Sequence, residues 1–85
     1  MLDAKDAYRL AKKVARESED WKYLEERIEY HVNRGDVQFF VSFDHNPQTI
    51  IHMMRELNYT VTPYKIDKAA SYYGFIISWF PLNVE

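Results

Sequence analysis

Three histidines, His31, His45 and His52, are the side chains best suited to metal binding or acid–base chemistry. Asp44, His45 and His52 would converge if a helix begins just after His45, because a helix N-terminus and its second turn are near neighbours. A protein zinc site needs three or four ligands, and this chain without cysteine has no second cluster to complete one. We therefore expect no metal site and interpret the histidines as exposed loop and helix residues.

The remaining reactive residue types give no stronger indication of chemistry. Ser42, Ser71 and Ser78 do not lie in the glycine-flanked turn that exposes a catalytic serine. Two glycines are too few for a phosphate-binding loop. Neighbouring carboxylates such as Glu25 and Glu26 lie among Lys and Arg residues, which is typical of a solvated helix face. We expect a protein that is not an enzyme and binds no cofactor.

Length and composition predict one small folded domain. The chain has 85 residues, of which 47% are hydrophobic, and a formal net charge of −2. This length supports a single domain, and the near-neutral charge argues against a general nucleic-acid binder. The N-terminus is charged and no apolar run is long enough to cross a membrane, so we expect an intracellular protein.

Charges and aromatic rings are unevenly distributed along this domain. Residues 1–36 hold eight basic and nine acidic side chains, whereas residues 37–85 hold three and four. The second segment nevertheless carries ten of the fourteen aromatic residues. We therefore expect one α+β domain over 1–85, with a charged helix in 1–35 and an aromatic-rich sheet in 36–85.

The N-terminal segment has the composition and spacing of a helix. It contains neither Pro nor Gly before Gly35, and Asp3 and Asp6 favour a helix start. One stripe advances in steps of three and four residues: Ala4, Ala7, Ala11, Val14, Ser18, Trp21, Glu25, Ile28 and Val32. A continuous helix of about 30 residues would span about 45 Å, so part of its stripe would need a partner subunit. Alternatively the helix breaks at residues 16–20, with Ser18 or Asp20 as the second N-cap.

The rest of the chain predicts a strand, a helix and two more strands. Residues 37–43 alternate between apolar and polar side chains, apart from Phe40, and Asn46 and Pro47 favour a helix start. An apolar stripe then runs to Leu57, and Asn58 suits a left-handed cap. Residues 59–66 and 72–80 form the last two strands, with Pro81 ending the second.

Details of these strands predict their order. Pro63 cannot donate a ladder hydrogen bond, so its strand belongs at an edge, whereas the very apolar last strand belongs in the centre. A right-handed crossover makes the first two strands parallel, on either side of the third. We expect a three-stranded mixed sheet of order 1-3-2 with helices on one face. Gly74 in the central strand indicates a bulge or the close approach of a helix.

The number of aromatic side chains exceeds what a core of this size would bury. Seven tyrosines and two tryptophans are residue types enriched at interface hot spots. The candidate interface comprises Tyr8, Trp21, Phe40, Tyr64, Tyr72 and Tyr73. These rings would either complete an intramolecular or dimeric core or bind a different protein, and we expect a homo-oligomer. Nucleic-acid stacking is less favoured, because only Arg55, Lys65 and Lys68 are nearby to meet phosphates.

Two short segments resemble a known group of proteins. The helix closing in residues 57–61, Leu-Asn-Tyr-Thr-Val, and the strand at residues 74–79, Gly-Phe-Ile-Ile-Ser-Trp, are similar to segments of small uncharacterised proteins of tailed bacteriophages. Tyr59 and Trp79 match that pattern as packing residues, whereas Pro63 and the tail from Phe80 to Glu85 depart from it. The resemblance implies a viral gene and a setting in the host cytoplasm or the virion, and it carries over no functional residue.

Three function classes follow from these observations. The first is a phage accessory protein, not an enzyme, that self-associates and binds a host or viral protein. The second is a virion or assembly component, and the third is a binder of nucleic acid or of signalling nucleotides.

Overall fold

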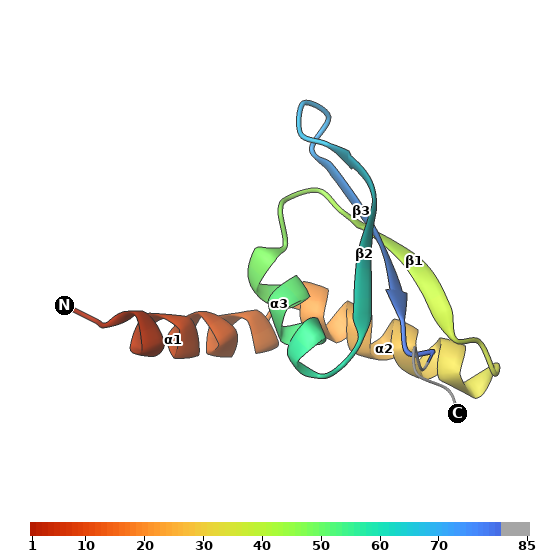
Figure 1. Cartoon of the computed structure of the whole chain (residues 1–85), viewed down its shortest axis with the longest axis horizontal. Coiled ribbons are helices and arrows are strands. Elements are labelled where there is room, and N and C mark those ends of the chain that lie inside the picture. The colour runs from red at the N-terminus through yellow and green to blue at the C-terminus, as the bar shows by residue number, and fades with distance from the viewer. Residues whose placement is uncertain (81–85) are drawn as a thin grey trace.

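The structure is a computed structural model and describes residues 1–80. It contains three helices and three strands in the order α1 (Ala4–Arg16), α2 (Glu19–Asn33), β1 (Gln38–Phe43), α3 (Gln48–Glu56), β2 (Thr60–Asp67) and β3 (Tyr72–Ser78). Figure 1 shows α1 projecting from the body at one end and the β2–β3 hairpin rising above the helices. The α+β class predicted from the sequence is confirmed.

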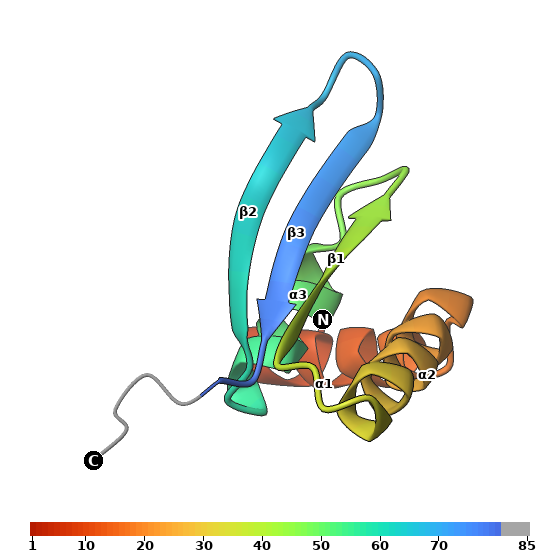
Figure 2. The same cartoon turned by 90° about the vertical axis from the view of Figure 1, so that its right-hand side faces the viewer.

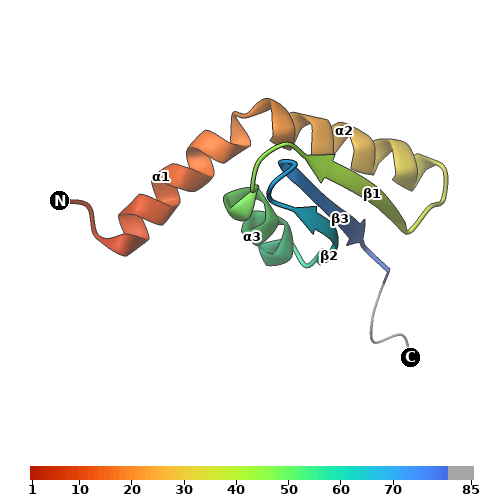
Figure 3. The ribbon, with the colours of Figure 1, turned by 90° about the horizontal axis from the view of Figure 1, so that it is seen from above.

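The N-terminal helical segment is broken, and the prediction of one continuous helix is wrong. Ser18 leaves helical geometry with φ −77° and ψ 156° and becomes the N-cap of α2. Its Oγ accepts a hydrogen bond from the Trp21 amide at 3.2 Å and donates one to the Ala15 carbonyl at 2.6 Å. The predicted alternative of two shorter helices is therefore confirmed, with Ser18 rather than Asp20 as the cap. α1 and α2 meet at an angle in Figure 3.

The other helix ends differ slightly from the sequence expectation. Asp3 is the N-cap of α1, and its carboxylate accepts from the Asp6 amide at 2.8 Å. α3 begins one residue later than expected, because Pro47 is its N-cap and makes no side-chain capping bond. Asn46 therefore does not cap this helix. Asn58, with φ 71°, confirms the predicted left-handed cap.

The sheet has the predicted strand order, with β3 between β1 and β2. Both neighbouring pairs are antiparallel, so the prediction of a mixed sheet is wrong: β1 and β2 run in the same direction but never pair. β3 ends at Ser78, two residues before the predicted Phe80. Pro81, the expected terminator, lies outside the described residues. Figure 2 shows the three strands side by side.

An irregularity in the sheet lies at Pro63 rather than at Gly74. The register between β2 and β3 shifts between Pro63 and Lys65, so the extra residue is Tyr64 on the edge strand. Proline at a bulge of an edge strand is consistent with its missing N–H group. The atoms closest to a Cβ at Gly74 would be ring carbons of Phe40 and Tyr72, so the predicted close approach of a helix at this residue is wrong.

The hydrophobic core lies between one face of the sheet and the two helices α2 and α3. The buried side chains are Ala15, Leu24, Phe39, Val41, Phe43, Ile50, Ile51, Met53, Met54, Val61, Phe75 and Ile77. α1 contributes only Ala15 to this set and packs against α3. The radius of gyration is 14.1 Å, whereas a compact domain of this length has about 12 Å. The elongation leaves apolar side chains of α1 and of the hairpin exposed.

Candidate functional site

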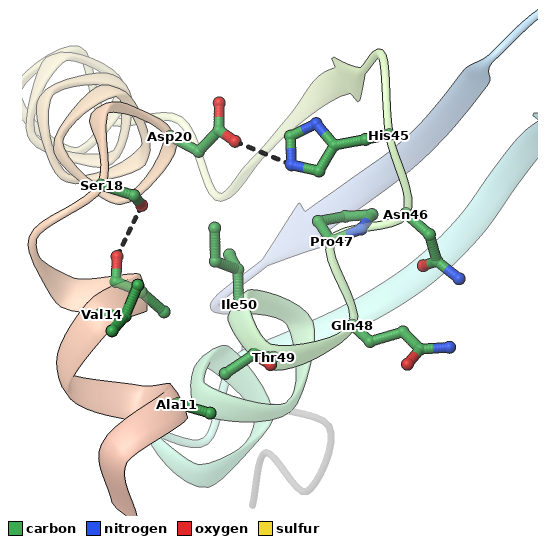
Figure 4. A pocket seen from close by; sticks show the side chains of 11 residues that line it. Ala11, Val14, Ser18, Asp20, His45, Asn46, Pro47, Gln48, Thr49 and Ile50 are labelled. Carbon is green, nitrogen blue, oxygen red and sulfur yellow. Dashed lines mark hydrogen bonds and ion pairs between the residues drawn. The ribbon is translucent and has the colours of Figure 1, made fainter. Parts of the chain in front are cut away.

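The Asp44–His45 pair lies between the end of β1 and the start of α3. His45 Nδ1 is 2.8 Å from an Asp44 carboxylate oxygen, and its Nε2 is 3.1 Å from a carboxylate oxygen of Asp20 at the start of α2. Figure 4 shows this second contact beside a groove. The expected third member, His52, instead has its ring edge-on to Tyr8, 5.3 Å between centroids. Asp20, and not His52, is therefore the third side chain of the group that contains Asp44 and His45.

Electrostatics favour the protonated form of His45. Its hydrogen bond to Asp44 and the negative charges of Asp20 and Asp44 raise the pKa of His45 above 6.5. The same hydrogen bond lowers the pKa of Asp44. An imidazolium ring donates from both nitrogens, so one His45 can bridge the two carboxylates. This contact ties the loop before α3 to the start of α2.

The groove beside Asp20 and His45 is lined by the end of α1 and the start of α3. It encloses about 510 Å³ and includes Val14, Pro47 and Ile50 among its lining residues. Ser18 lies in the wall, but its hydroxyl is occupied by helix capping. Among residues 1–80 no group of three or more His, Asp or Glu side chains is placed to hold a metal ion. We therefore assign no reaction to this groove.

His31 has a structural environment. Its ring stacks on Phe39 at 5.0 Å, and its Nδ1 lies 2.8 Å from an Asp36 carboxylate oxygen. Arginine can only donate, so the 3.0 Å contact from Arg27 makes Nε2 the acceptor and places the proton on Nδ1. The hydrogen bond from His31 lowers the pKa of Asp36. His31 thus joins the end of α2 to β1.

The face of the sheet opposite the core carries a cluster of aromatic rings. This surface, the open face, consists of Phe40, Ser42, Thr62, Tyr64, Lys65, Tyr72, Gly74 and Ile76. Phe40 pairs with Ile76 across β1 and β3, and its ring meets Tyr64 edge-on at 5.6 Å. In Figure 2 the sheet is viewed from this side, with α1 and α3 behind it.

Gly74 leaves room for two of these rings beside the central strand. A Cβ atom at this position would be 3.0 Å from ring carbons of both Phe40 and Tyr72. Lys65, paired with Gly74, places its Nζ 5.9 Å from the centre of the Tyr72 ring. The missing side chain at Gly74 thus creates the space in which the rings gather.

The open face is exposed even though it is apolar. Tyr64 retains 68% and Phe40 47% of their accessible surface, and Tyr72 and Ile76 are half-buried. Within residues 1–80, no helix covers these rings. An exposed cluster of Tyr, Phe and Ile is typical of a protein interaction surface. Of the described surfaces, it is the best candidate functional site.

Three of the six predicted interface residues lie elsewhere. Tyr8 faces α3, where its hydroxyl donates to Glu56 at 2.9 Å, and partial burial followed by this bond raises the pKa of Tyr8. Trp21 is half-buried against the core. Tyr73, opposite Phe43 and Ile66, also packs against the core. The structure brings together the other three, Phe40, Tyr64 and Tyr72.

Sequence reasoning did not include Gly74 in the site, although the predicted strand order contained the signal. Once Tyr72 is placed on one face of β3, the two-residue period puts Gly74 and Ile76 on the same face. Tyr64 reaches this face at the bulge, which alternation alone does not predict.

Comparison of the chain with protein-family models, curated proteins and solved structures found no match. No helix among residues 1–80 is long and apolar enough for a membrane span.

Proposed function

We propose that this chain is a binding protein, not an enzyme, that self-associates and docks a different protein on the open face. The observation that carries the proposal is the exposed ring cluster of Phe40, Tyr64 and Tyr72 over Gly74. Large, rigid aromatic side chains give much contact area at little cost in conformational entropy, which suits them to an interface centre.

The chemistry of the open face favours a protein over a nucleic acid. Lys65 is the one basic side chain within the surface, and it lies over Tyr72. Single-stranded nucleic-acid sites combine stacking rings with a basic groove along the backbone, and one lysine provides little of that attraction. A protein partner with an apolar patch would bury the rings and leave Lys65 at the polar rim.

The biological setting in this proposal comes from the resemblance to small phage proteins. In that setting the chain is an accessory protein in the host cytoplasm that binds a host or phage protein. A role in the virion is the alternative, which absence of the chain from purified particles would exclude.

An affinity capture with matched variants tests the proposal. The bait is the full chain, either wild type, Phe40→Ser with Tyr64→Ser, or Tyr23→Ser as a control. Tyr23 is on α2 and 50% exposed, so it matches the exposed aromatic character without belonging to the open face. We expect one protein to be retained by the wild type and the control and lost from the double variant.

Two further results would overturn the proposal. Retention of the same protein by the double variant would exclude the open face as its docking surface. Saturable binding of a single-stranded oligonucleotide at physiological salt, abolished by the double variant, would assign the face to nucleic acid instead.

A further inference from the structure

One side of α1 is apolar and uncovered. α1 contacts α3 through the side that bears Tyr8 and Ala15. The adjacent side, the free α1 face, consists of Ala7, Leu10, Ala11 and Val14, all exposed, with Val14 at 70% and Leu10 at 47%. Figure 3 shows α1 extending away from the sheet, so a second helix has room to approach.

The sizes of these side chains suit a second copy of the same helix. If two α1 helices pack antiparallel about a two-fold axis near Leu10 and Ala11, each Val14 meets an Ala7 of the other copy. Each Leu10 then lies beside an Ala11. Large side chains opposite small ones interdigitate and allow a close approach of the helix axes.

The charges beside the free α1 face suit the same arrangement. Asp6 and Lys13 are seven residues apart and so lie on the same flank of the helix. In an antiparallel two-fold pair the same flanks meet, so Asp6 of each copy lies about 3 Å along the axis from the level of Lys13 of the other. Asp6 also pairs with Arg9 of its own helix. A parallel pair would instead align the acidic first turns, and the helix dipoles would oppose it as well.

We infer that the free α1 face is the surface through which two copies of this chain associate, with their α1 helices antiparallel. This inference rests on the self-association part of the proposed function and is independent of the open face. The self-complementarity of side-chain size, together with the opposite charges of Asp6 and Lys13, points to a second copy rather than to a different partner.

Charge reversal tests the inference by mixing two variants. Asp6→Lys makes both contacts between the copies basic, and Lys13→Asp makes both acidic, so each variant alone should dimerise about tenfold more weakly than the wild type. Mixed together, they should form a heterodimer as stable as the wild-type dimer, measured by sedimentation equilibrium. Failure of the mixture to associate would overturn the inference.

Engineered cysteines test the orientation, since the natural chain has none. Chains with Ala7→Cys and chains with Val14→Cys, mixed under oxidising conditions, should give mainly the mixed disulfide. Preferential formation of the two homodimeric disulfides would indicate a parallel pair and contradict the inference.

The ends of the pair provide an independent charge test. Glu17 of one copy lies near Asp3 of the other, so their acidic groups oppose association. Glu17→Lys should therefore tighten the dimer by about threefold, whereas Glu29→Lys on α2, away from this contact, should not. An equal effect of both substitutions would show only a change in net charge and overturn the assigned register.

Val14→Asp separates the two proposals. Because Val14 is exposed, this variant should keep its fold by circular dichroism but dimerise at least about tenfold more weakly. It should still bind the protein partner through the open face. A wild type that stays monomeric at millimolar concentration, or a dimer lost only in Phe40→Ser, would overturn the inference.

Discussion

At the scale of single residues, the junction between the helices depends on two polar side chains with different tasks. Ser18 lies at the break between α1 and α2. Its hydroxyl donates to the Ala15 carbonyl of α1 and accepts from the Trp21 amide of α2. His45 connects the loop before α3 to α2 through Asp20. Both act locally, so substitutions at either position change stability and leave the open face intact.

Ser18→Ala should lower the free energy of unfolding by about 1 kcal/mol, the usual effect of losing an N-cap side chain. Ser18→Thr is the matched control, since its hydroxyl can still accept from the Trp21 amide and donate to the Ala15 carbonyl. Urea denaturation measures both variants. Equal losses in the two would show that capping is not the contribution of Ser18.

The stability of the fold should depend on pH through the ionisation of His45, and the direction of the change can be stated. The pKa of His45 in the folded chain is raised above its ordinary value of 6.5. Its contacts with the carboxylates therefore contribute fully to stability when the pH is below about 6.5. The contribution is lost as the pH rises through the folded pKa. Asp44, whose pKa is lowered, behaves in the opposite sense, and its contribution is lost as the pH falls through its folded pKa.

An NMR titration of the His45 ring checks this assignment. Asp20→Asn should lower the pKa of His45, because it removes one of the two facing negative charges. Asp67→Asn in the distant hairpin serves as the control and should leave the titration curve in place. An unchanged midpoint in Asp20→Asn would contradict the contact between α2 and this loop.

Substitution of Trp21 tests whether this side chain belongs to the core or to an interface. It is half-buried and packs against the core, so Trp21→Ala should cost about 2–3 kcal/mol of stability. Tyr23→Ala, at an exposed position of the same helix, should change stability by less than about 0.5 kcal/mol. Thermal denaturation compares them, and a stable Trp21→Ala protein that fails only in association would return Trp21 to the interface.

At the scale of elements, the sequence predicted those helices and strands that local periodicity determines. The missing N–H group of Pro63 and the apolar character of the last strand were sufficient for the strand order. The helix break was left open, because Ser18 fits a helical stripe and an N-cap equally well. The bulge at Tyr64 was missed, because a shift in register between strands is decided by tertiary pairing and not by either strand alone.

Gly74→Ala tests how the central strand supports the rings. The added Cβ would lie 3.0 Å from Phe40 and Tyr72, so both rings must move. They are on the solvent side, so we expect stability to change by no more than about 1 kcal/mol while partner binding falls about tenfold. Tyr23→Ser, at an exposed position of α2 outside the open face, is the control and should bind normally. A loss of stability without loss of binding would contradict this role.

At the scale of the whole molecule, the sequence predicted an excess of apolar surface but only part of its location. Composition alone indicated more aromatic rings than the core would hold. Trp21, Tyr8 and Tyr73 were assigned to the interface because their types suit one, yet each packs within the chain. Which rings remain exposed depends on where α2 and α3 cover the sheet, and that is a property of the assembled fold.

The same assembly explains why binding is the proposed function. α2 and α3 cover one face of the sheet, α1 projects with its free face exposed, and the open face is uncovered within the described chain. Burying either surface against a partner would remove exposed Leu, Val, Phe and Tyr side chains from water. The two proposed surfaces lie on different elements, so occupation of one would leave the other accessible.

The most direct test of this account is the affinity of the captured, purified partner for the wild type and for Phe40→Ser with Tyr64→Ser, measured by titration calorimetry. We predict that the dissociation constant rises at least about tenfold in the double variant and stays within about twofold in Tyr23→Ser. Equal affinities of the wild type and a correctly folded double variant would contradict the claim that the open face is the binding surface.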